Sequence, residues 1–203
     1  MDILSTQDII LAVNNLAQIP DKTKWKTTTS KIFKLSLLQY LNNRPKMSWV
    51  ELGAAQGHTT HVLSCIAKNV LSVDRVEENC AKIRNFKHQN VEVISLDLYG
   101  DNFSKLMSNS NFDAAIIDAI HETQNVLVDI ENCKLANVKL FVFDDYGAFK
   151  GVKAAVDSFI LDLESKNIDH RVTFAGMPPG SYFPNTGFKI LQDWEGIIVE
   201  LND

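Results

Sequence analysis

Five short apolar runs alternate with helix-forming segments between residues 47 and 165, and this alternation restricts the possible folds more than any other feature. The apolar runs are 47–53, 69–74, 91–97, 112–118 and 138–145, and the helical segments are 57–67, 76–86, 101–109, 122–135 and 149–165. Strands that alternate with helices form right-handed βαβ units, whose parallel strands are buried on both faces. The sequence therefore predicts an α/β fold with a doubly wound, mostly parallel sheet and helices on both of its faces.

The first 46 residues predict a helical cap ahead of this alternating core. In residues 3–18 apolar side chains recur at near-helical spacing, and the pattern ends at Pro20. These side chains are Ile3, Ile9, Ile10, Val13, Leu16 and Ala17. After a loop rich in Lys and Thr, Thr29 or Ser30 is expected to cap a second helix. The apolar side chains of that helix are Ile32, Leu35, Leu38 and Leu41.

The alternation of strand and helix ends in the C-terminal segment. Three further apolar runs lie at 170–176, 188–191 and 196–201. Pairing of the last two suggests an antiparallel edge that completes a seven-stranded sheet, with the Pro- and Gly-rich loop 176–187 over one rim. We expect a single domain, 1–203, in which residues 1–46 cap a core formed by residues 47–203.

Length and composition limit the class of protein. With 203 residues and no internal repeat, one fold accounts for the whole chain. Acidic residues outnumber basic ones by 25 to 20, which argues against a chain-wide surface for nucleic acid. The cysteines Cys65, Cys80 and Cys133 lack disulfide or zinc spacing, so we expect a reducing, cytoplasmic location. Without a signal-peptide pattern or a long apolar run, no membrane partner is expected.

Acidic side chains stand at or next to the carboxyl end of every expected parallel strand. The set is Glu51, Asp74, Asp97, Asp118 and the pair Asp144 and Asp145. In an open α/β sheet these strand ends meet at one rim, where ligands bind. A single acid there is commonly a helix cap. Several together would repel one another unless a cation or a hydrogen-bonding ligand lies among them.

The turn after the first strand carries the most specific pattern. Gly53 and Gly57 bracket a tight turn in which the backbone approaches a ligand, and the small Ala54 and Ala55 keep the space open. A dinucleotide fingerprint would need a further glycine, so the ligand is not expected to be NAD. Asp74 follows Gly53 by 21 residues, which suits an acid that accepts hydrogen bonds from a ribose.

Residues Glu51–Thr60, together with Asp74 and Asp97, resemble the cofactor site of class I S-adenosylmethionine-dependent methyltransferases. The segment ELGAAQGHTT is similar to the corresponding turn of catechol-type O-methyltransferases. The resemblance implies a Rossmann-like fold, with the methionine part of the cofactor against the turn, its ribose at the acid after strand two and its adenine at the acid after strand three. The implied cofactor-binding residues are Glu51, Gly53, Ala54, Ala55, Gly57, Thr59, Thr60, Asp74, Arg75, Asp97, Leu98 and Asp118.

The second half of the chain resembles the metal-dependent O-methyltransferases of the catechol and macrocin types. This resemblance rests on FDAAIIDAIHETQNVLVDI and LFVFDDYGAFKGVKAAVDSF. It implies that Asp118, Asp144 and Asp145 hold Mg²⁺, a cation that prefers such hard oxygen ligands. Macrocin-type enzymes carry a further acid where this chain has Ile120. We therefore expect His121 to act with Asp118 in catalysis, as the general base; the alternative is a capping or supporting role at the start of 122–135.

The segments expected to border the acceptor contain aromatic, basic and histidine residues. The aromatic residues Trp25, Tyr146, Tyr182 and Phe183 lie in segments expected to border the site, although most aromatic side chains in such a domain belong to the core. The basic run Lys22–Lys26, with Lys31 and Lys34, is expected to be a solvated face or, alternatively, a flap over an anionic or glycosyl acceptor. Of His58 and His61, one is expected to line the cofactor turn and the other to lie on a helix surface.

These features predict an S-adenosylmethionine-dependent, Mg²⁺-assisted O-methyltransferase that acts on a hydroxyl of a small molecule or sugar. Two alternatives remain: a metal-independent enzyme that methylates nitrogen, and a non-catalytic S-adenosylmethionine-binding module. No nucleic acid partner is expected. The N-terminal amphipathic helix is a candidate contact of a homodimer.

Overall fold

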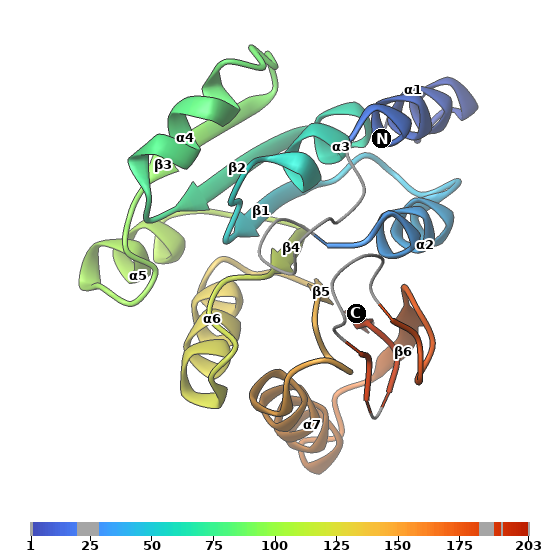
Figure 1. The fold of residues 1–203 in the computed structure, drawn as a ribbon. Coiled ribbons are helices and arrows are strands. Elements are labelled where there is room, and N and C mark those ends of the chain that lie inside the picture. The colour runs from blue at the N-terminus through green and yellow to red at the C-terminus, as the bar shows by residue number, and fades with distance from the viewer. Residues whose placement is uncertain (1, 20–28, 183–188, 192, 203) are drawn as a thin grey trace.

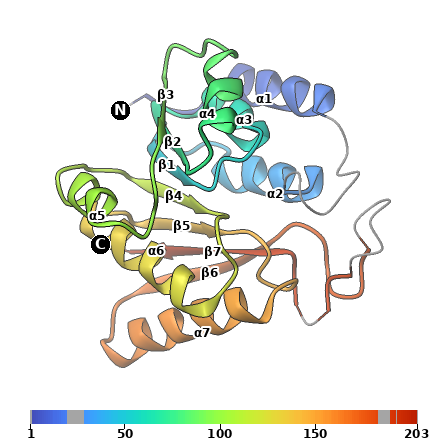
Figure 2. The same ribbon diagram turned by 60° about the vertical axis from the view of Figure 1, so that its left-hand side comes forward.

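The computed structural model describes residues 2–19, 29–182, 189–191 and 193–202. Its strands are β1 (Ser48–Leu52), β2 (Asn69–Asp74), β3 (Val91–Ser95), β4 (Ala114–Ile117), β5 (Leu140–Phe143), β6 (His170–Ala175) and β7 (Gly196–Leu201). They form one sheet in the order β3-β2-β1-β4-β5-β7-β6; Figure 1 shows the fold, and Figure 2 labels all seven strands. Strands β1 to β5 are mutually parallel, and β7 runs antiparallel to both β5 and β6. The predicted Rossmann-like α/β fold with an antiparallel C-terminal edge is confirmed.

The helices are α1 (Thr6–Gln18), α2 (Lys31–Leu41), α3 (His58–Ile66), α4 (Glu77–Arg84), α5 (Asp101–Ser108), α6 (Thr123–Leu135) and α7 (Lys150–Ser165). From α3 to α7, every helix boundary lies within two residues of its predicted position. One apolar cluster joins α1, α2 and α3 to the sheet, and a second joins α5, α6 and α7 to the opposite face (Figure 2). None of the described helices combines the length and apolar character that a membrane span requires.

The alternation of side chains along the strands explains the nearly continuous apolar runs. In β1, Trp49 packs in the cluster with α1 to α3, whereas its neighbours Val50 and Leu52 pack with α5 to α7. Successive residues of a strand point to opposite faces, so a strand covered by helices on both sides needs apolar residues at every position. The acids Asp74, Asp97, Asp118 and Asp144 stand at or just beyond the carboxyl ends of their strands, and this places them at one rim of the sheet.

The structure corrects the predicted apolar face of the first helix. Ser5 caps α1 in a capping box with Asp8, so Ile3 lies ahead of the helix and forms a β-bridge with Pro45. The buried side chains of α1 are Ala12 and Leu16, while Ile10 and Val13 are 46% and 39% exposed. The predicted start of the helix at residue 3 is therefore wrong, and Ile10 and Val13 lie outside its buried face. Apolar residues surround more than half of this helix, so their spacing alone could not select the buried face.

The predicted partner of the last strand is also wrong. Residues 189–191 do not pair with β7; within the described chain, Lys189 forms an isolated bridge with Tyr182. Strand β6 takes that place, with six paired positions from His170 opposite Leu201 to Ala175 opposite Gly196. A six-residue antiparallel register provides more ladder hydrogen bonds than the four residues of 188–191 could, which explains the preference. Residue 188 lies outside the described part.

Candidate cofactor and cation site

A cavity of about 210 Å³ opens at the carboxyl ends of β1, β2 and β4 and beside the turn after β3. Of the predicted cofactor residues, it is lined by Gly53, Ala55, Asp74, Arg75, Asp97, Leu98 and Asp118. The sequence did not point to four further lining residues, Val76, Asn79, Tyr99 and Ala119, because they carry no pattern of their own. A larger cleft of about 460 Å³ lies at the amino ends of β2 and β3. The smaller cavity is the candidate ligand site, because open α/β sheets bind ligands at the carboxyl ends of their strands.

The first turn is shaped by close backbone approaches. Gly53 has φ of 89°, and a Cβ atom there would lie 2.1 Å from the backbone oxygen of Asp118. Gly57, with φ of 77°, begins α3, and a Cβ atom there would lie 2.6 Å from the Ile83 side chain. Ala55 also has a positive φ, 46°. The chain therefore passes from β1 into α3 under steric limits that only glycine meets at these two positions.

Asp74 forms one wall of the cavity, and hydrogen bonds fix its carboxylate. It accepts bonds from the backbone N–H groups of Ala55 at 2.8 Å and Val76 at 2.7 Å, and from Asn79 Nδ2 at 3.3 Å. Asp97, by contrast, is exposed and accepts a bond from the N–H of Tyr99 at 3.1 Å. Each carboxylate oxygen can accept more than one hydrogen bond, so both side chains can still receive a ligand hydroxyl or amino group.

Glu51 lies beneath the turn and does not line the cavity in the described structure. Its Oε2 atom accepts hydrogen bonds from Thr60 Oγ1 and, at 2.7 Å, from Ser72 Oγ. Burial raises the pKa of Glu51 to about 7, and the two hydroxyl donors oppose that rise. Ala54, Gly57, Thr59 and Thr60 likewise belong to this supporting layer beneath the cavity.

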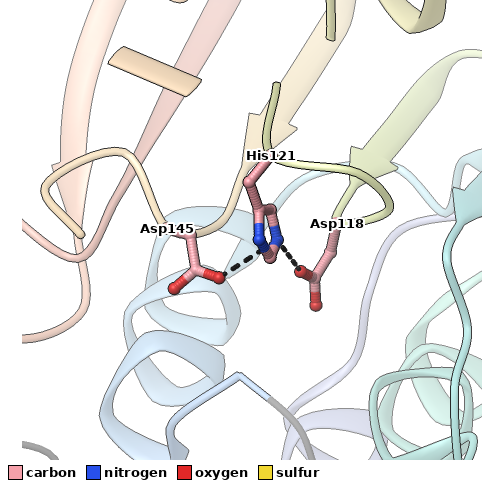
Figure 3. Close-up of side chains that lie close together, drawn as sticks. All are labelled: Asp118, His121 and Asp145. Atoms are coloured by element: carbon pink, nitrogen blue, oxygen red, sulfur yellow. Dashed lines mark ion pairs between the residues drawn. The ribbon is translucent and has the colours of Figure 1, made fainter. Parts of the chain in front are cut away.

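A second group of polar side chains lies between the ends of β4 and β5. His121 Nε2 is 3.6 Å from Asp118 Oδ1 and 3.2 Å from Asp145 Oδ2, and the ring stands between the two carboxylates (Figure 3). One ligand atom from each of the three residues lies within 4.8 Å of the others. The Phe149 ring stacks on His121 at a centroid distance of 4.2 Å. We refer to Asp118, His121 and Asp145 as the acid–histidine group.

The two carboxylates of the acid–histidine group fit a divalent cation, because they are hard oxygen ligands in a partly open position, and the imidazole of His121 stands beside them. The group overlaps the predicted metal set at Asp118 and Asp145 and brings His121 to them. The third predicted ligand, Asp144, is buried in the same turn and is not a member of the group within the described residues. Asp145 has φ of 60°, a left-handed conformation that is strained for a residue with a side chain. Its carbonyl oxygen accepts bonds from the N–H groups of Ala148 and Phe149 at 3.0 and 2.9 Å.

Several residues assigned to the acceptor side lie elsewhere. Lys34 is only 1% exposed and donates to the carbonyl oxygen and hydroxyl of Thr29, so its predicted place on a solvated face is wrong. Position 34 lies on the buried face of α2, and Thr29 supplies hydrogen-bond acceptors for the buried ammonium group. Tyr146 is buried, and its hydroxyl donates to Asp157 at 2.6 Å, whereas Tyr182 is exposed. Trp25, Phe183 and the run Lys22–Lys26 lie outside the described residues.

The two histidines near the first turn do not line the described cavity. His61 Nδ1 lies 2.8 Å from His88 Nε2, and both rings contact Phe86. His58 is half-buried, and burial lowers its pKa. The predicted contact of one of them with a ligand in the cofactor turn therefore stays a prediction.

Two fully buried acids, Asp129 and Glu195, were not predicted from the sequence, and Asp129 lies nearer the cavity. Asp129, on α6, is fully buried, and its burial raises its pKa to about 8. Its Oδ2 atom lies 3.5 Å from the Tyr99 hydroxyl, behind the cavity wall. The available signal was its helical spacing from Val126 and Cys133, which places an acid on the apolar face of the helix.

No protein-family model matches the sequence, and no curated protein matches it either. Solved structures do match its fold. An O-methyltransferase from Bacillus cereus in complex with SAH is 15% identical, with 98% of this chain and 92% of that chain covered and a TM-score of 0.61. A tRNA (m1A58) methyltransferase from Aquifex aeolicus is also 15% identical, with 93% and 75% covered and a TM-score of 0.59. An rRNA methylase from Streptococcus thermophilus is 15% identical, with 98% and 99% covered and a TM-score of 0.52.

The chain has the class I methyltransferase fold. This agrees with the resemblance seen in the residues of the first turn. The methyltransferase fold supports several chemistries, and at this level of identity the likeness concerns the fold alone. The names of the neighbours cover both O-methylation and RNA methylation, so they do not select an acceptor. Function has to be argued from the site.

Proposed function

We propose that this protein is an S-adenosylmethionine-dependent methyltransferase that transfers the methyl group to a hydroxyl of a small molecule or sugar, assisted by Mg²⁺ or another hard divalent cation. The observation that carries the proposal is the position of Asp118. Asp118 lines the cavity at the strand ends. Its carboxylate also belongs to the acid–histidine group, where Oδ1 lies 3.6 Å from His121 Nε2. A ligand in the cavity and a hydroxyl at the acid–histidine group would therefore be neighbours.

In this proposal, different residues of the cavity bind different parts of the cofactor. The turn of Gly53 and Ala55 faces the methionine part, Asp74 with Arg75 takes the ribose, and Asp97 with Leu98 takes the adenine. Glu51, Ala54, Gly57, Thr59 and Thr60 support this turn from below. S-adenosylmethionine, when bound, supplies an activated methyl group on a positively charged sulfur.

The acid–histidine group prepares the acceptor. Asp118, Asp144 and Asp145 are the proposed cation ligands, and a bound cation would lower the pKa of an acceptor hydroxyl. His121 Nε2 accepts the hydroxyl proton as the acceptor oxygen bonds to the methyl carbon. The carbon–sulfur bond of a bound cofactor would supply the methyl group, and the electron pair of that bond would stay on sulfur. Stacking on Phe149 restrains the imidazole, so less conformational freedom is lost when it meets the acceptor.

Further proposals concern the domain, the location and the partners of the chain. We propose one domain, 1–203, in which residues 1–46 and the loop 176–187 border the acceptor. Free thiols at Cys65, Cys80 and Cys133 agree with a cytoplasmic location. Exposed Ile10 and Val13 on α1 are the candidate homodimer contact. An RNA acceptor is the rival suggested by the neighbours' names, and the net charge of −5 is the observation against it.

Isothermal titration with S-adenosylmethionine and Mg²⁺, separately and together, tests this proposal. We expect the cofactor to bind and Mg²⁺ to be required for turnover of a panel of catechols and glycosides, while a structured RNA is not methylated. Failure to bind the cofactor would remove the basis of the proposal. Turnover independent of Mg²⁺ would favour the metal-free alternative, and methylated RNA would identify the rival acceptor.

The variant His121→Ala tests the proton acceptor. Its rate should fall by roughly 10² to 10⁴ because general-base catalysis contributes that much. Cofactor affinity should remain within about threefold of the wild-type value, since His121 does not line the cavity in the described structure. His170→Ala, on β6 at the sheet edge, is the matched control. A loss of less than about tenfold would assign His121 to the capping or supporting role instead.

A further inference from the structure

Lys153, on α7, contacts several segments that are distant in sequence. Its Nζ atom lies 2.6 Å from the Tyr146 hydroxyl and 3.3 Å from carboxylate oxygens of both Asp157 and Asp193. The ammonium also stands over the Tyr146 ring, 4.2 Å from its centroid. One side chain therefore connects the turn after β5, the body of α7 and the segment that leads into β7.

The turn that Lys153 contacts is the one that presents Asp145. Tyr146 follows Asp145 directly, is buried, and donates its hydroxyl proton to Asp157. The next residue, Gly147, is pressed against the other segment: a Cβ atom there would lie 2.4 Å from the carbonyl oxygen of Asp193. Leu191 N–H donates to the carbonyl of Gly147 at 3.1 Å. Residues 146 and 147 are thus held from both sides.

The conformation of Asp145 is one that these contacts can stabilise. Its φ of 60° is strained for a residue with a side chain, and such conformations persist only where the surroundings impose them. Tyr146 anchors the chain immediately after this strained residue. If that anchor loosened, Asp145 could relax, and its carboxylate would move away from Asp118 and His121.

Residues 189–191 and 193–195 extend the connection to residues 176–182 of the expected acceptor loop. Ile190 N–H donates to the carbonyl of Ser181, and the N–H of Gly180 donates to the carbonyl of Ile190, both at 2.9 Å. These bonds place the described part of the loop, up to residue 182, on the segment that Lys153 reaches through Asp193.

We propose that Lys153 is a positioning residue that holds the Asp145 turn in its cation-binding conformation and attaches this turn to the acceptor loop. The inference rests on the proposed function, because it assumes a cation at the acid–histidine group. Ion pairs that are partly exposed contribute little to stability in general. Lys153 differs because it also donates a hydrogen bond to Tyr146, a buried residue next to the proposed ligand Asp145. Substitution of groups that orient metal ligands typically lowers metal affinity by about 10- to 100-fold.

The test is the variant Lys153→Met, with Lys166→Met as the matched control because Lys166 makes an exposed pair with Asp162, at 2.8 Å, at the far end of α7. Mn²⁺ titrated into the SAH-saturated protein should bind about 10- to 100-fold more weakly to Lys153→Met, with SAH affinity unchanged and Lys166→Met equal to wild type. Lys153→Arg should recover most of the lost Mn²⁺ affinity. Tyr146→Phe, which keeps the ring but removes the hydroxyl, should also weaken Mn²⁺ binding, by a smaller factor. If Lys153→Met does not fold, Tyr146→Phe takes its place in the test.

Hydrogen exchange separates failure of this inference from failure of the proposed function. The amides of Ala148 and Phe149, which donate to Asp145, should exchange at least about tenfold faster in Lys153→Met than in Lys166→Met. If wild-type protein binds no Mn²⁺, the cation of the proposed function is wrong, and the positioning role is decided by the exchange rates. Unchanged Mn²⁺ affinity together with unchanged exchange would overturn the inference.

Discussion

The carboxyl rim of the sheet holds its acids in two different ways. On the side of β1 and β2, Asp74 accepts hydrogen bonds from two backbone N–H groups, so its position follows from the course of the main chain. On the side of β4 and β5, Asp118 and Asp145 face the ring of His121 at ion-pair distance. The first side is organised by backbone geometry and the second by opposing side chains.

This difference indicates what each side can do. A carboxylate fixed by amide donors is pre-organised for a neutral partner such as a ribose, because its position does not depend on the ligand. Two carboxylates around an imidazole depend on what lies between them, since removing the positive or hydrogen-bonding partner leaves like charges close together. Substitution of a neighbouring side chain should therefore change cofactor affinity less than it changes the geometry of the acid–histidine group.

Gly53→Ala should have the largest effect, because it acts where the two sides touch. The new Cβ atom would lie 2.1 Å from the backbone oxygen of Asp118, and φ at this position is 89°. Relief of this contact must move the first turn or the end of β4. We expect SAH affinity to fall by more than about 100-fold and unfolding free energy by about 3 kcal/mol, measured by titration calorimetry and urea denaturation.

Gly180→Ala is the matched control for that substitution. Gly180 also has a positive φ, 86°, but none of the atoms in the described part of the chain lies within 4 Å of the added Cβ position. It should therefore lose only about 1 kcal/mol through its backbone conformation and keep wild-type SAH affinity. Equal behaviour of the two variants would show that the contact with Asp118 does not separate them, and the proposed connection between the two sides would be wrong.

Glu51→Gln tests whether Glu51 titrates in its buried position. This acid lies on the cofactor side and accepts hydrogen bonds from the hydroxyl groups of Thr60 and Ser72. Burial raises the pKa of Glu51 from about 4.5 to about 7, so between these values the folded protein retains a proton that the unfolded chain has released. The free energy of unfolding should therefore fall as pH rises through this window, by about 3 kcal/mol in total for this one group. Glutamine can still accept both hydroxyl bonds but does not titrate.

The measurement is urea denaturation of wild type and Glu51→Gln at pH 4.5 and pH 8. The variant should gain stability relative to wild type by about 3 kcal/mol between these two values, because only the wild-type carboxyl has to ionise in its buried position. Glu92→Gln, exposed on β3, should track the wild-type protein at both values. A constant difference between Glu51→Gln and wild type would mean that Glu51 does not titrate in this window.

The same contrast explains how far the sequence predicts this molecule. Strand and helix positions follow from hydrophobic periodicity, and the rule that strand ends meet at one rim correctly brings Asp74 and Asp118 to the same cavity. The position of His121 between Asp118 and Asp145 depends on the turn after β5, whose left-handed Asp145 has no sequence signature. Burial of Lys34, and the choice of β6 as partner of β7, likewise depend on tertiary contacts between distant segments.

Asn79→Ala should have the smallest effect and bears most directly on the claim that the backbone organises the cofactor side. Asn79 Nδ2 donates to Asp74 at 3.3 Å, longer than the two backbone bonds at 2.8 and 2.7 Å. Its loss leaves those two donors in place, and the lost bond is long, so SAH affinity should fall by only about 2- to 10-fold. Asp74→Asn, which makes the acceptor itself neutral and replaces one of its oxygens with a donor, should cost more. If Asn79→Ala matched Asp74→Asn in titration calorimetry, the side chain and not the main chain would hold Asp74, and the distinction between the two sides of the rim would no longer stand.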